Sequence, residues 1–404
     1  MHKQRGHNML TPNCKSTCLA VFLLTFSAQA SGSELLVGTA SFDITPSEPV
    51  ALCGQFGLRI SRGIETPLTA NVLALESRRP DQSSDLAIMV SCDVISVPAD
   101  VLELVRQEVQ KRLPDLDTKK IFLGGTHTHT APELRLGKWI LPEEGVMSVE
   151  RYRAFFAERV AEAIAEAWKG RASGSVSWGL SHAVVAYNRR AVYANGSARM
   201  YGSTSTPEFR NLEGYEDHDV LTLFAFSADG KLIAMAVNVS CPSQEVESGR
   251  SVNADFWHPV RDTLHKQYGD EVCVLGWTGA GGDQSPHLMY RKAADERMRK
   301  LRGLTRLEEI ARRVVRAVDE AYEVVKDDRH TEVPLVHRVE TLHLPMRLVT
   351  ESEHAEAKAG MEQAATQIEK DPKAADRVYR RMKWYEAKRP TPIRPTRWNC
   401  TWCA

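Results

Sequence analysis

IFLGGTHTHTAP, residues 121–132, places an apolar strand directly before two glycines and a histidine-rich segment. In an extended chain alternate side chains share a face, so we expect His127 and His129 to project to one side and the threonines to the other. Two neutral imidazoles on one face are a start for a zinc site, and the glycines let the backbone approach a ligand closely. The alternative is a pair of surface histidines that hydrogen-bond to the threonine hydroxyls.

The same order of apolar strand and polar loop recurs at residues 272–287. The strand 272–275 precedes GWTGAGGDQSPH, whose glycines can present N–H groups to developing negative charge. Ser285 stands between the carboxylate of Asp283 and an imidazole in sequence, which makes it a candidate nucleophile or substrate-binding hydroxyl. The alternative is a glycine-rich turn in which both side chains cap local backbone.

A third polar segment follows the predicted strand 233–239. It reads NVSCPSQE from residue 238 and continues to DFWH at 255–258. Cys241 and His258 are its metal-binding candidates, although a cysteine is more often a small buried hydrophobe and His258 lies early in a predicted helix. The pair Arg189 and Arg190 is a weaker candidate for binding a carboxylate or an oxyanion, since such pairs are usually solvated.

Alternating strand and helix patterns predict an α/β or α+β fold with a mixed sheet and flanking helices. Because sites in open α/β sheets gather at the carboxyl ends of strands, we expect the three polar segments to converge. Asp229-Gly230 marks a hairpin turn. The remaining predicted strands are 88–91 and 220–226, and the predicted helices are 101–113, 149–168 after a Ser148 cap, 305–325 and 350–388, the last interrupted at Asp371-Pro372.

Composition restricts the classes of function. The chain has 404 residues, with 52 Lys plus Arg against 52 Asp plus Glu, which argues against a broad phosphate-binding surface, so nucleic acid is not the expected partner. Hydrophobic residues at 43% and charged residues at 26% are typical of a folded globular protein. The eight cysteines do not form a disulfide scaffold, and the lone pair Cys400 and Cys403 is a weak zinc or redox signal.

Residues 1–30 have the pattern of an export signal. Lys3, Arg5 and Lys15 supply positive charge, CLAVFLLTF at 18–26 is a short apolar core, and Ala28-Gln29-Ala30 fits a cleavage site. We therefore expect a secreted or periplasmic protein, cleaved near Ala30. A buried N-terminal helix is the alternative. Beyond residue 30 no apolar run approaches the ~20 residues that span a bilayer.

These motifs, taken together and in order, resemble the neutral/alkaline non-lysosomal ceramidase family. The resemblance is carried by VGTASFDITP at 37–46, GTHTHTAP at 125–132, NRR at 188–190 and GDQSP at 282–286. It runs from about residue 35 to 325, and more weakly to 388. It implies a ceramidase-like catalytic domain and an exported zinc amidase that cleaves the N-acyl bond of ceramide-like sphingolipids. A lipid or small-molecule amide substrate and peripheral contact with membrane lipid follow from it.

Carried over by position, the resemblance assigns roles to individual residues. His127 looks like the first zinc-binding histidine, and His129 like a second active-site histidine. Ser285 looks like the active-site serine, with Asp283 beside it, and Arg189 or Arg190 like the contact of an anionic intermediate. The family's second histidine ligand is not found near 238–240, where Cys241 as a thiolate, or His258, would take its place. The family's glutamate and tyrosine ligands come from a segment beyond this chain.

The resemblance also divides the chain. We expect a signal peptide at 1–30, the N-terminal catalytic domain at 31–330, a strand and long helix that begin the remaining domain at 331–389, and an aberrant tail at 390–404. With common codons, residues 398–404 read in another frame give Val-Glu-Leu-His-Val-Val-Arg, an alternating strand pattern. We therefore expect that a frameshift truncated the protein.

Two other functions are compatible with the same residues. One is a hydrolase of another amide or an ester on the same scaffold, which the altered segment at Cys241-Pro242 favours. The other is a truncated or non-catalytic family member that only binds a ligand. Substrate profiling separates the first alternative from a ceramidase, and the presence of bound zinc argues against the second.

Overall fold

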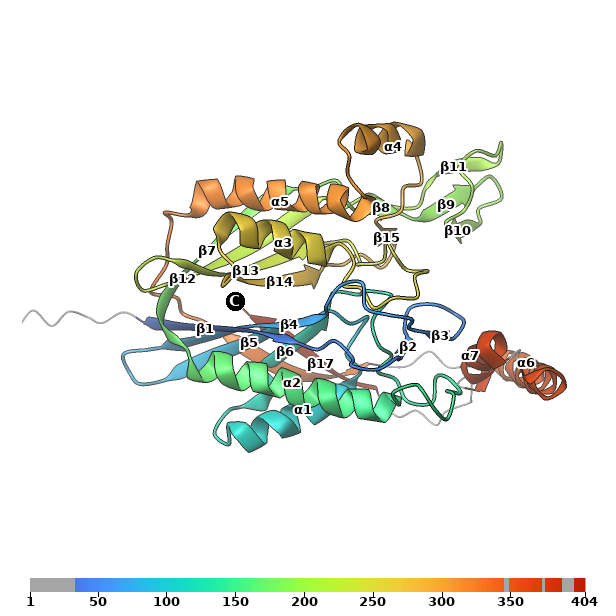
Figure 1. The fold of residues 1–404 in the computed structure, drawn as a ribbon, viewed down its shortest axis with the longest axis horizontal. Coiled ribbons are helices and arrows are strands. Elements are labelled where there is room, and N and C mark those ends of the chain that lie inside the picture. Colours follow the sequence, from blue (N-terminus) through green and yellow to red (C-terminus); the bar gives the residue numbers. More distant parts are fainter. Residues whose placement is uncertain (1–32, 345–348, 373–374, 387–395, 404) are drawn as a thin grey trace, which may run out of the picture. The chain divides into compact units, whose positions relative to one another are not determined.

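The computed structural model describes residues 33–344, 349–372, 375–386 and 396–403. The predicted signal at 1–30 lies outside these residues. Eight strands form one sheet in the order β14-β13-β12-β7-β1-β4-β5-β6 (Figure 1). They are β1 (Glu34–Asp43), β4 (Thr69–Arg78), β5 (Ser84–Cys92), β6 (Ile121–Gly125), β7 (Ala172–His182), β12 (Asp219–Ser227), β13 (Leu232–Val239) and β14 (Cys273–Thr278).

The sheet is mixed. β13 pairs with β14 and β5 with β6 in parallel, and the other neighbours pair antiparallel. The prediction of a mixed α/β fold is therefore confirmed. Short strands form smaller sheets: β2 (Ala51–Leu52) with β3 (Arg59–Ile60), β8 (Tyr187–Asn188) with β15 (Gln284–Ser285), β9 (Arg190–Tyr193) with β10 (Ala198–Met200) and β11 (Phe209–Leu212), and β16 (His337–Leu344) with β17 (Thr396–Cys403).

Three helices begin where the sequence predicted their caps. The Ser148 hydroxyl accepts a hydrogen bond from the Arg151 N–H at 3.2 Å, and Thr305 and Thr350 each form a complete capping box. These predictions are confirmed. The helices are α1 (Ala99–Arg112), α2 (Val149–Lys169), α3 (Trp257–Tyr268), α4 (Lys292–Leu301), α5 (Arg306–Val325), α6 (Glu351–Lys370) and α7 (Ala375–Glu386), with a short 3₁₀ turn at Thr118–Lys120.

The large sheet folds over so that its two halves face each other, with helices on both outer faces. α1 and α2 cover the half made of β1, β4, β5 and β6, and α3 and α5 cover the half made of β7, β12, β13 and β14 (Figure 1). Alternate residues of each strand point inward or outward, and Leu73 and Leu75 of β4 share one buried cluster with Leu275 and Trp277 of β14 between the halves. The rings of Phe122 and Trp277 stack across this interface, with centroids 4.9 Å apart.

Three long strands, β1, β4 and β7, had not been predicted. β1 and β4 are largely buried on both faces, and β7 is buried in this way over residues 174–177, so these stretches lack the alternation that marks a half-exposed strand. Serine, threonine and glycine also interrupt their apolar pattern. Gly38 of β1 is there because a Cβ would overlap the carbonyl oxygen of Ala167 on α2.

Residues 331–389 contain the expected strand and helical region. β16 is followed by α6 and α7, which are separated at Asp371 as predicted. Residues 396–403 of the tail pair with β16 as β17. The domain boundaries and the frameshift stay predictions. No helix in the described ranges is long and apolar enough to cross a membrane.

Candidate active site

The three polar segments converge, as the sequence predicted, at the carboxyl ends of β6, β13 and β14. The carbonyl oxygen of Thr126 accepts hydrogen bonds from the Ser243 N–H at 3.2 Å and from the Thr278 hydroxyl at 3.1 Å. The Gly279 N–H donates to the carbonyl of Val239 at 2.8 Å. These bonds tie the loop after β6 to the loops after β13 and β14, and form one polar region.

His127 and His129 lie together, but not by the alternation of an extended chain. His127 has a left-handed backbone (φ 69°), and its ring centroid lies 5.2 Å from that of His129. The neighbouring threonines face inward and are buried, and Thr128 and Thr130 donate to the carbonyl of Asn253. The histidines are therefore separated from the threonines, as expected. The separation comes from a turn that the hydrogen bonds of the Thr128 and Thr130 hydroxyls stabilise.

Burial keeps His127 neutral. It lowers the pKa of His127 to about 4, with smaller contributions in the same direction from His129, Arg189 and Arg135. The His127 N–H donates to the carbonyl of Val94 at 3.0 Å, which fixes the backbone beneath the ring. A neutral imidazole can accept a proton or bind a metal ion.

Glu247 joins His129 to His287. Its Oε2 atom lies 3.3 Å from His129 Nδ1, and its Oε1 atom lies 3.8 Å from His287 Nδ1. The contact with His129 makes the largest contribution that lowers the pKa of Glu247, and the electrostatic effects of His287, His129 and Arg189 act in the same direction. The carboxylate of Glu247 is thus held in its ionised form at the centre of the cluster.

Glu245 lies on the far side of His287. Its Oε2 atom is 3.8 Å from His287 Nε2, and its Oε1 atom is 3.5 Å from Nε of Arg306. Burial raises the pKa of Glu245 to about 7, against the opposing charge of Arg306. Burial also lowers the pKa of His287. The neutral forms of both groups are therefore favoured relative to the same groups in water.

Two buried groups hold the loop that carries both glutamates. The Asp255 carboxylate accepts a hydrogen bond from the Val246 N–H at 2.8 Å, between Glu245 and Glu247. Arg59 Nη1 donates to the carbonyl of Glu247 at 2.8 Å. Both hydrogen bonds are made to backbone atoms of the loop. They therefore fix the loop without using the carboxylates of Glu245 and Glu247.

The two candidate arginines, Arg189 and Arg190, have different partners in the structure. Arg189 Nη2 donates to the carbonyl of Gly282 at 2.7 Å, and its charge acts on His127 and Glu247. Arg190 forms an ion pair with Glu213 instead. Arg189 is thus the arginine that faces the cluster.

Ser285 and Asp283 lie beside the cluster. Ser285 is fully buried, and its hydroxyl accepts a hydrogen bond from the backbone N–H of His287 at 3.1 Å. Asp283 Oδ2 accepts from the side-chain amide of Asn188 at 2.8 Å. Both side chains fix the loop after β14, and their catalytic roles stay predictions.

Cys241 and His258 have other contacts. Cys241 is fully buried in the apolar core under α3 and α5, where burial raises the pKa of its thiol well above the ordinary value and opposes a thiolate. His258 Nε2 lies 3.5 Å from Asp262 Oδ2, one turn along α3. Their roles as metal ligands also stay predictions.

The side chains around Glu247 are of the types that bind zinc. Imidazole nitrogens and carboxylate oxygens are zinc ligands, and His129 Nδ1 and Glu245 Oε2 are buried without a hydrogen bond of good geometry. Across the described ranges, no three His, Cys, Asp or Glu side chains are arranged closely enough to hold a metal ion. The donor types therefore fit zinc, while a ligand geometry is not formed.

A cavity of about 740 Å³ adjoins the cluster, between α4 and the start of α5. Glu245 and His287 contribute to its wall, together with Leu288, Lys292 and Arg299. Its volume is within the range of small-molecule sites. A ligand in this cavity would reach the Glu245 side of His287.

The sequence motifs assign no roles to Glu245, Glu247 and His287. Glu245 and His287 stand within the quoted motifs, but their spacing gave no geometric signal because they meet across two loops. Gly54 was also missed. It has a positive φ of 92°, and a Cβ there would lie 2.5 Å from His129 Cγ, so only glycine leaves room for the ring.

No family model and no curated protein matches this chain. Among solved structures, it is similar to the neutral ceramidase from Pseudomonas aeruginosa, with 15% identity and a TM-score of 0.58, covering 78% of this chain and 49% of that protein. A structure described as ceramidase complexed with C2 gives 16% identity, a TM-score of 0.57, and coverage of 78% and 48%. The chain has a ceramidase-like fold and spans about half the length of these proteins.

Proposed function

We propose that this chain is an exported, zinc-dependent hydrolase that cleaves the N-acyl amide bond of a ceramide-like lipid, giving a fatty acid and a sphingoid base. The observation that carries the proposal is the cluster of His127, His129, Glu247 and His287 at the strand ends. The ceramidase-like fold supports the choice of substrate class.

His127, His129 and Glu247 are the side chains that we expect to hold zinc. The pKa of about 4 keeps His127 unprotonated at neutral pH, and the lowered pKa of Glu247 keeps its carboxylate ionised. Both are the forms that bind a metal ion. Bound zinc would supply Lewis-acid polarisation of the amide carbonyl.

The remaining polar groups are suited to charge and proton handling. The charge of the Arg189 guanidinium acts on His127 and Glu247, and it can stabilise the anion that forms when the amide carbonyl is attacked. His287 and Glu245 lie beside the adjoining cavity, with Nε2 and Oε2 3.8 Å apart, and either group can donate or accept a proton there. Such a group can protonate the amine that leaves.

The proposal is tested by the hydrolysis of an N-acyl sphingoid amide and of its ester analogue by the purified chain. We expect release of fatty acid from the amide, loss of the activity on chelation, and recovery with zinc. Cleavage of the ester alone would support the other hydrolase. No cleavage of either compound by the zinc-loaded chain would contradict the proposal.

The two adjacent arginines provide a matched pair. Arg189→Ala should lower kcat by about 100-fold because it removes charge near the developing anion. Arg190→Ala should leave kcat close to the wild-type value, since Arg190 pairs with Glu213. Equal effects of the two substitutions would show that Arg189 has no special place in the reaction.

A further inference from the structure

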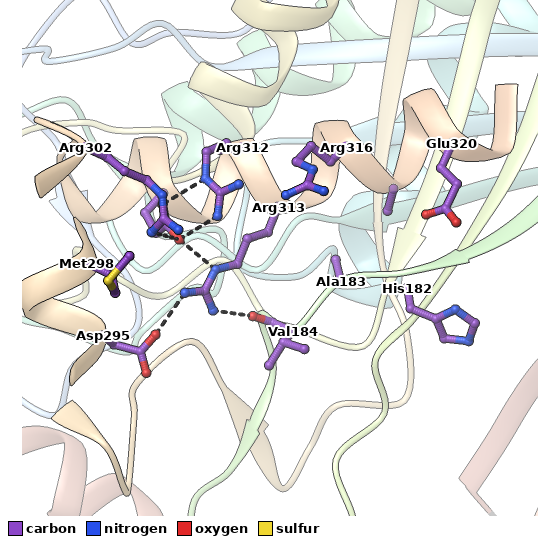
Figure 2. Close-up of a pocket in the computed structure, with 12 residues that line it drawn as sticks. His182, Ala183, Val184, Asp295, Met298, Arg302, Arg312, Arg313, Arg316 and Glu320 are labelled. Atoms are coloured by element: carbon purple, nitrogen blue, oxygen red, sulfur yellow. Dashed lines mark hydrogen bonds and ion pairs between the residues drawn. The ribbon is translucent and has the colours of Figure 1, made fainter. Parts of the chain in front are cut away.

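A second cavity, of about 680 Å³, lies between α4, α5 and the segment after β7. Glu247 and His287 do not contribute to its wall. Arginine side chains dominate its lining, and Figure 2 shows three of them one after another along α5. The four arginines are Arg302, Arg312, Arg313 and Arg316.

Three of these guanidinium groups share one buried carboxylate. Glu309 is 1% exposed, and its Oε1 atom lies 2.9 Å from Arg312 Nη2, 2.9 Å from Arg313 Nε and 3.4 Å from Arg302 Nη1. Hydrogen bonds from Arg312 and Arg313 lower the pKa of Glu309 to about 2, against the effect of burial, so it stays charged. Arg313 has a second acid, Asp295, at 2.9 Å. Two carboxylates therefore face three cations.

Arg316 adds a fourth cation, one helical turn after Arg312. It is exposed, and within the described part of the chain it makes no hydrogen bond or ion pair. The remaining acid of the wall, Glu320, accepts a hydrogen bond from the Ser181 hydroxyl at 2.7 Å. Nη1 of Arg312 is also not used by Glu309. The cavity thus has guanidinium donors that its own carboxylates do not saturate.

We propose that this cavity binds a phosphate ester, with Arg312 and Arg316 as its main phosphoryl contacts and Arg302 as a third. A free carboxylate has two acceptor oxygens and one charge, whereas a phosphoryl group has three acceptor oxygens and nearly two charges, which suit several guanidinium groups better. Val184 and Met298 offer an apolar wall for the body of the ester. The volume is that of a small-molecule site. This proposal does not depend on the hydrolase activity.

The test is calorimetric titration of the full chain with phenyl phosphate, inorganic phosphate and acetate at constant ionic strength. We expect saturable binding of phenyl phosphate, weaker binding of inorganic phosphate and none of acetate. Arg316→Ala should weaken binding of phenyl phosphate by at least about tenfold, because it removes a charged hydrogen-bond donor. Arg316→Lys should restore part of the affinity. Arg297→Ala, an exposed arginine outside the cavity wall, should not change it.

A second arm separates a soluble ester from a lipid headgroup. Phosphatidylcholine vesicles with and without phosphatidic acid are sedimented with the wild-type chain and with Arg316→Ala. Binding that requires both phosphatidic acid and Arg316 assigns the phosphate to a lipid and supports the site. Absence of binding in both arms, acetate binding as tight as that of phenyl phosphate, or unchanged affinity in Arg316→Ala would each overturn the proposal.

Discussion

At the scale of single residues, Gly54 shows how little room the cluster leaves. Its φ of 92° is unfavourable for other residues, and a Cβ would overlap the His129 ring. We predict that Gly54→Ala lowers the free energy of unfolding by about 2 kcal/mol or more, since the backbone strain and the overlap add. Urea unfolding measures the effect.

Two other glycines provide controls for this prediction. A Cβ at Gly137 (φ 66°) would meet nothing within 4 Å, so Gly137→Ala reports backbone strain alone. A Cβ at Gly63 would also meet nothing, and its φ is not positive. The loss should decrease from position 54 to 137 to 63. Equal losses at 54 and 137 would show that contact with His129 is unimportant.

Glu309 predicts a dependence of stability on pH. Its pKa falls from the ordinary 4.5 to about 2 in the folded chain, so its contribution to stability is complete above about pH 4.5 and is lost as the pH falls through 2. Glu309→Gln should therefore lower the free energy of unfolding by on the order of 3 kcal/mol at pH 7. The difference from wild type should shrink below pH 4.5 in urea titrations.

Glu296 is a matched control for Glu309. Hydrogen bonding with Arg299 also lowers its pKa to about 2, but Glu296 is at the surface, where solvent and salt screen the interaction. Glu296→Gln should change stability much less than Glu309→Gln. The account of Glu309 would fail if its substitution had no effect at pH 7, or an equal effect at pH 7 and pH 3.

Residues of the site could be predicted from sequence only within one segment. His127 and His129 are two positions apart, so their proximity follows from any local conformation. Glu247 reaches His129 because Asp255 and Arg59 fix its loop, and the contact with Arg59 joins residues 188 positions apart in the chain. No spacing rule contains that information.

At the scale of elements, a buried ion pair joins the end of β5 to α3 and the loop before His127. Asp93 is fully buried, and its two oxygens accept from Arg261 at 2.7 and 2.9 Å. The Thr126 hydroxyl donates to Asp93 at 3.2 Å. We predict that Arg261→Met lowers the free energy of unfolding by about 3 to 5 kcal/mol, because it leaves a buried charge without its partner.

A double-mutant cycle distinguishes the interaction between Asp93 and Arg261 from the packing of each side chain with its other neighbours. Adding Asp93→Asn to Arg261→Met should cost less than the sum of the single changes. The exposed pair of Arg151 and Glu48 is the comparison, and Arg151→Met should leave stability nearly unchanged. Additive losses at Asp93 and Arg261 would show that the two residues do not act as a pair.

Elements were predictable to the extent that their signals are local. Helices α2, α5 and α6 begin with side-chain caps, which a few residues define. β1, β4 and β7 are defined by partners distant in sequence, and β1 and β4 also by burial on both faces, so their local pattern is weak.

At the scale of the whole molecule, the fold class followed from the sequence, but the facing of the two half-sheets did not. The contacts that join the halves, such as the Ser91 hydroxyl to the Gly276 carbonyl at 2.5 Å, link residues 185 positions apart. This folding brings the carboxyl ends of β6 and β14 together, and the site depends on it. A ceramidase-like fold is therefore the frame of the site, and the loops at the strand ends carry the cluster around Glu247.

The most direct test of the central claim is the zinc content of the purified full chain, measured by mass spectrometry for wild type, His127→Ala, Glu247→Ala and His258→Ala. The account predicts about one zinc per wild-type chain, loss of zinc in the first two variants, and retention in His258→Ala, whose side chain pairs with Asp262. Absence of zinc from the wild type after incubation with zinc, or retention of zinc in Glu247→Ala, would contradict it.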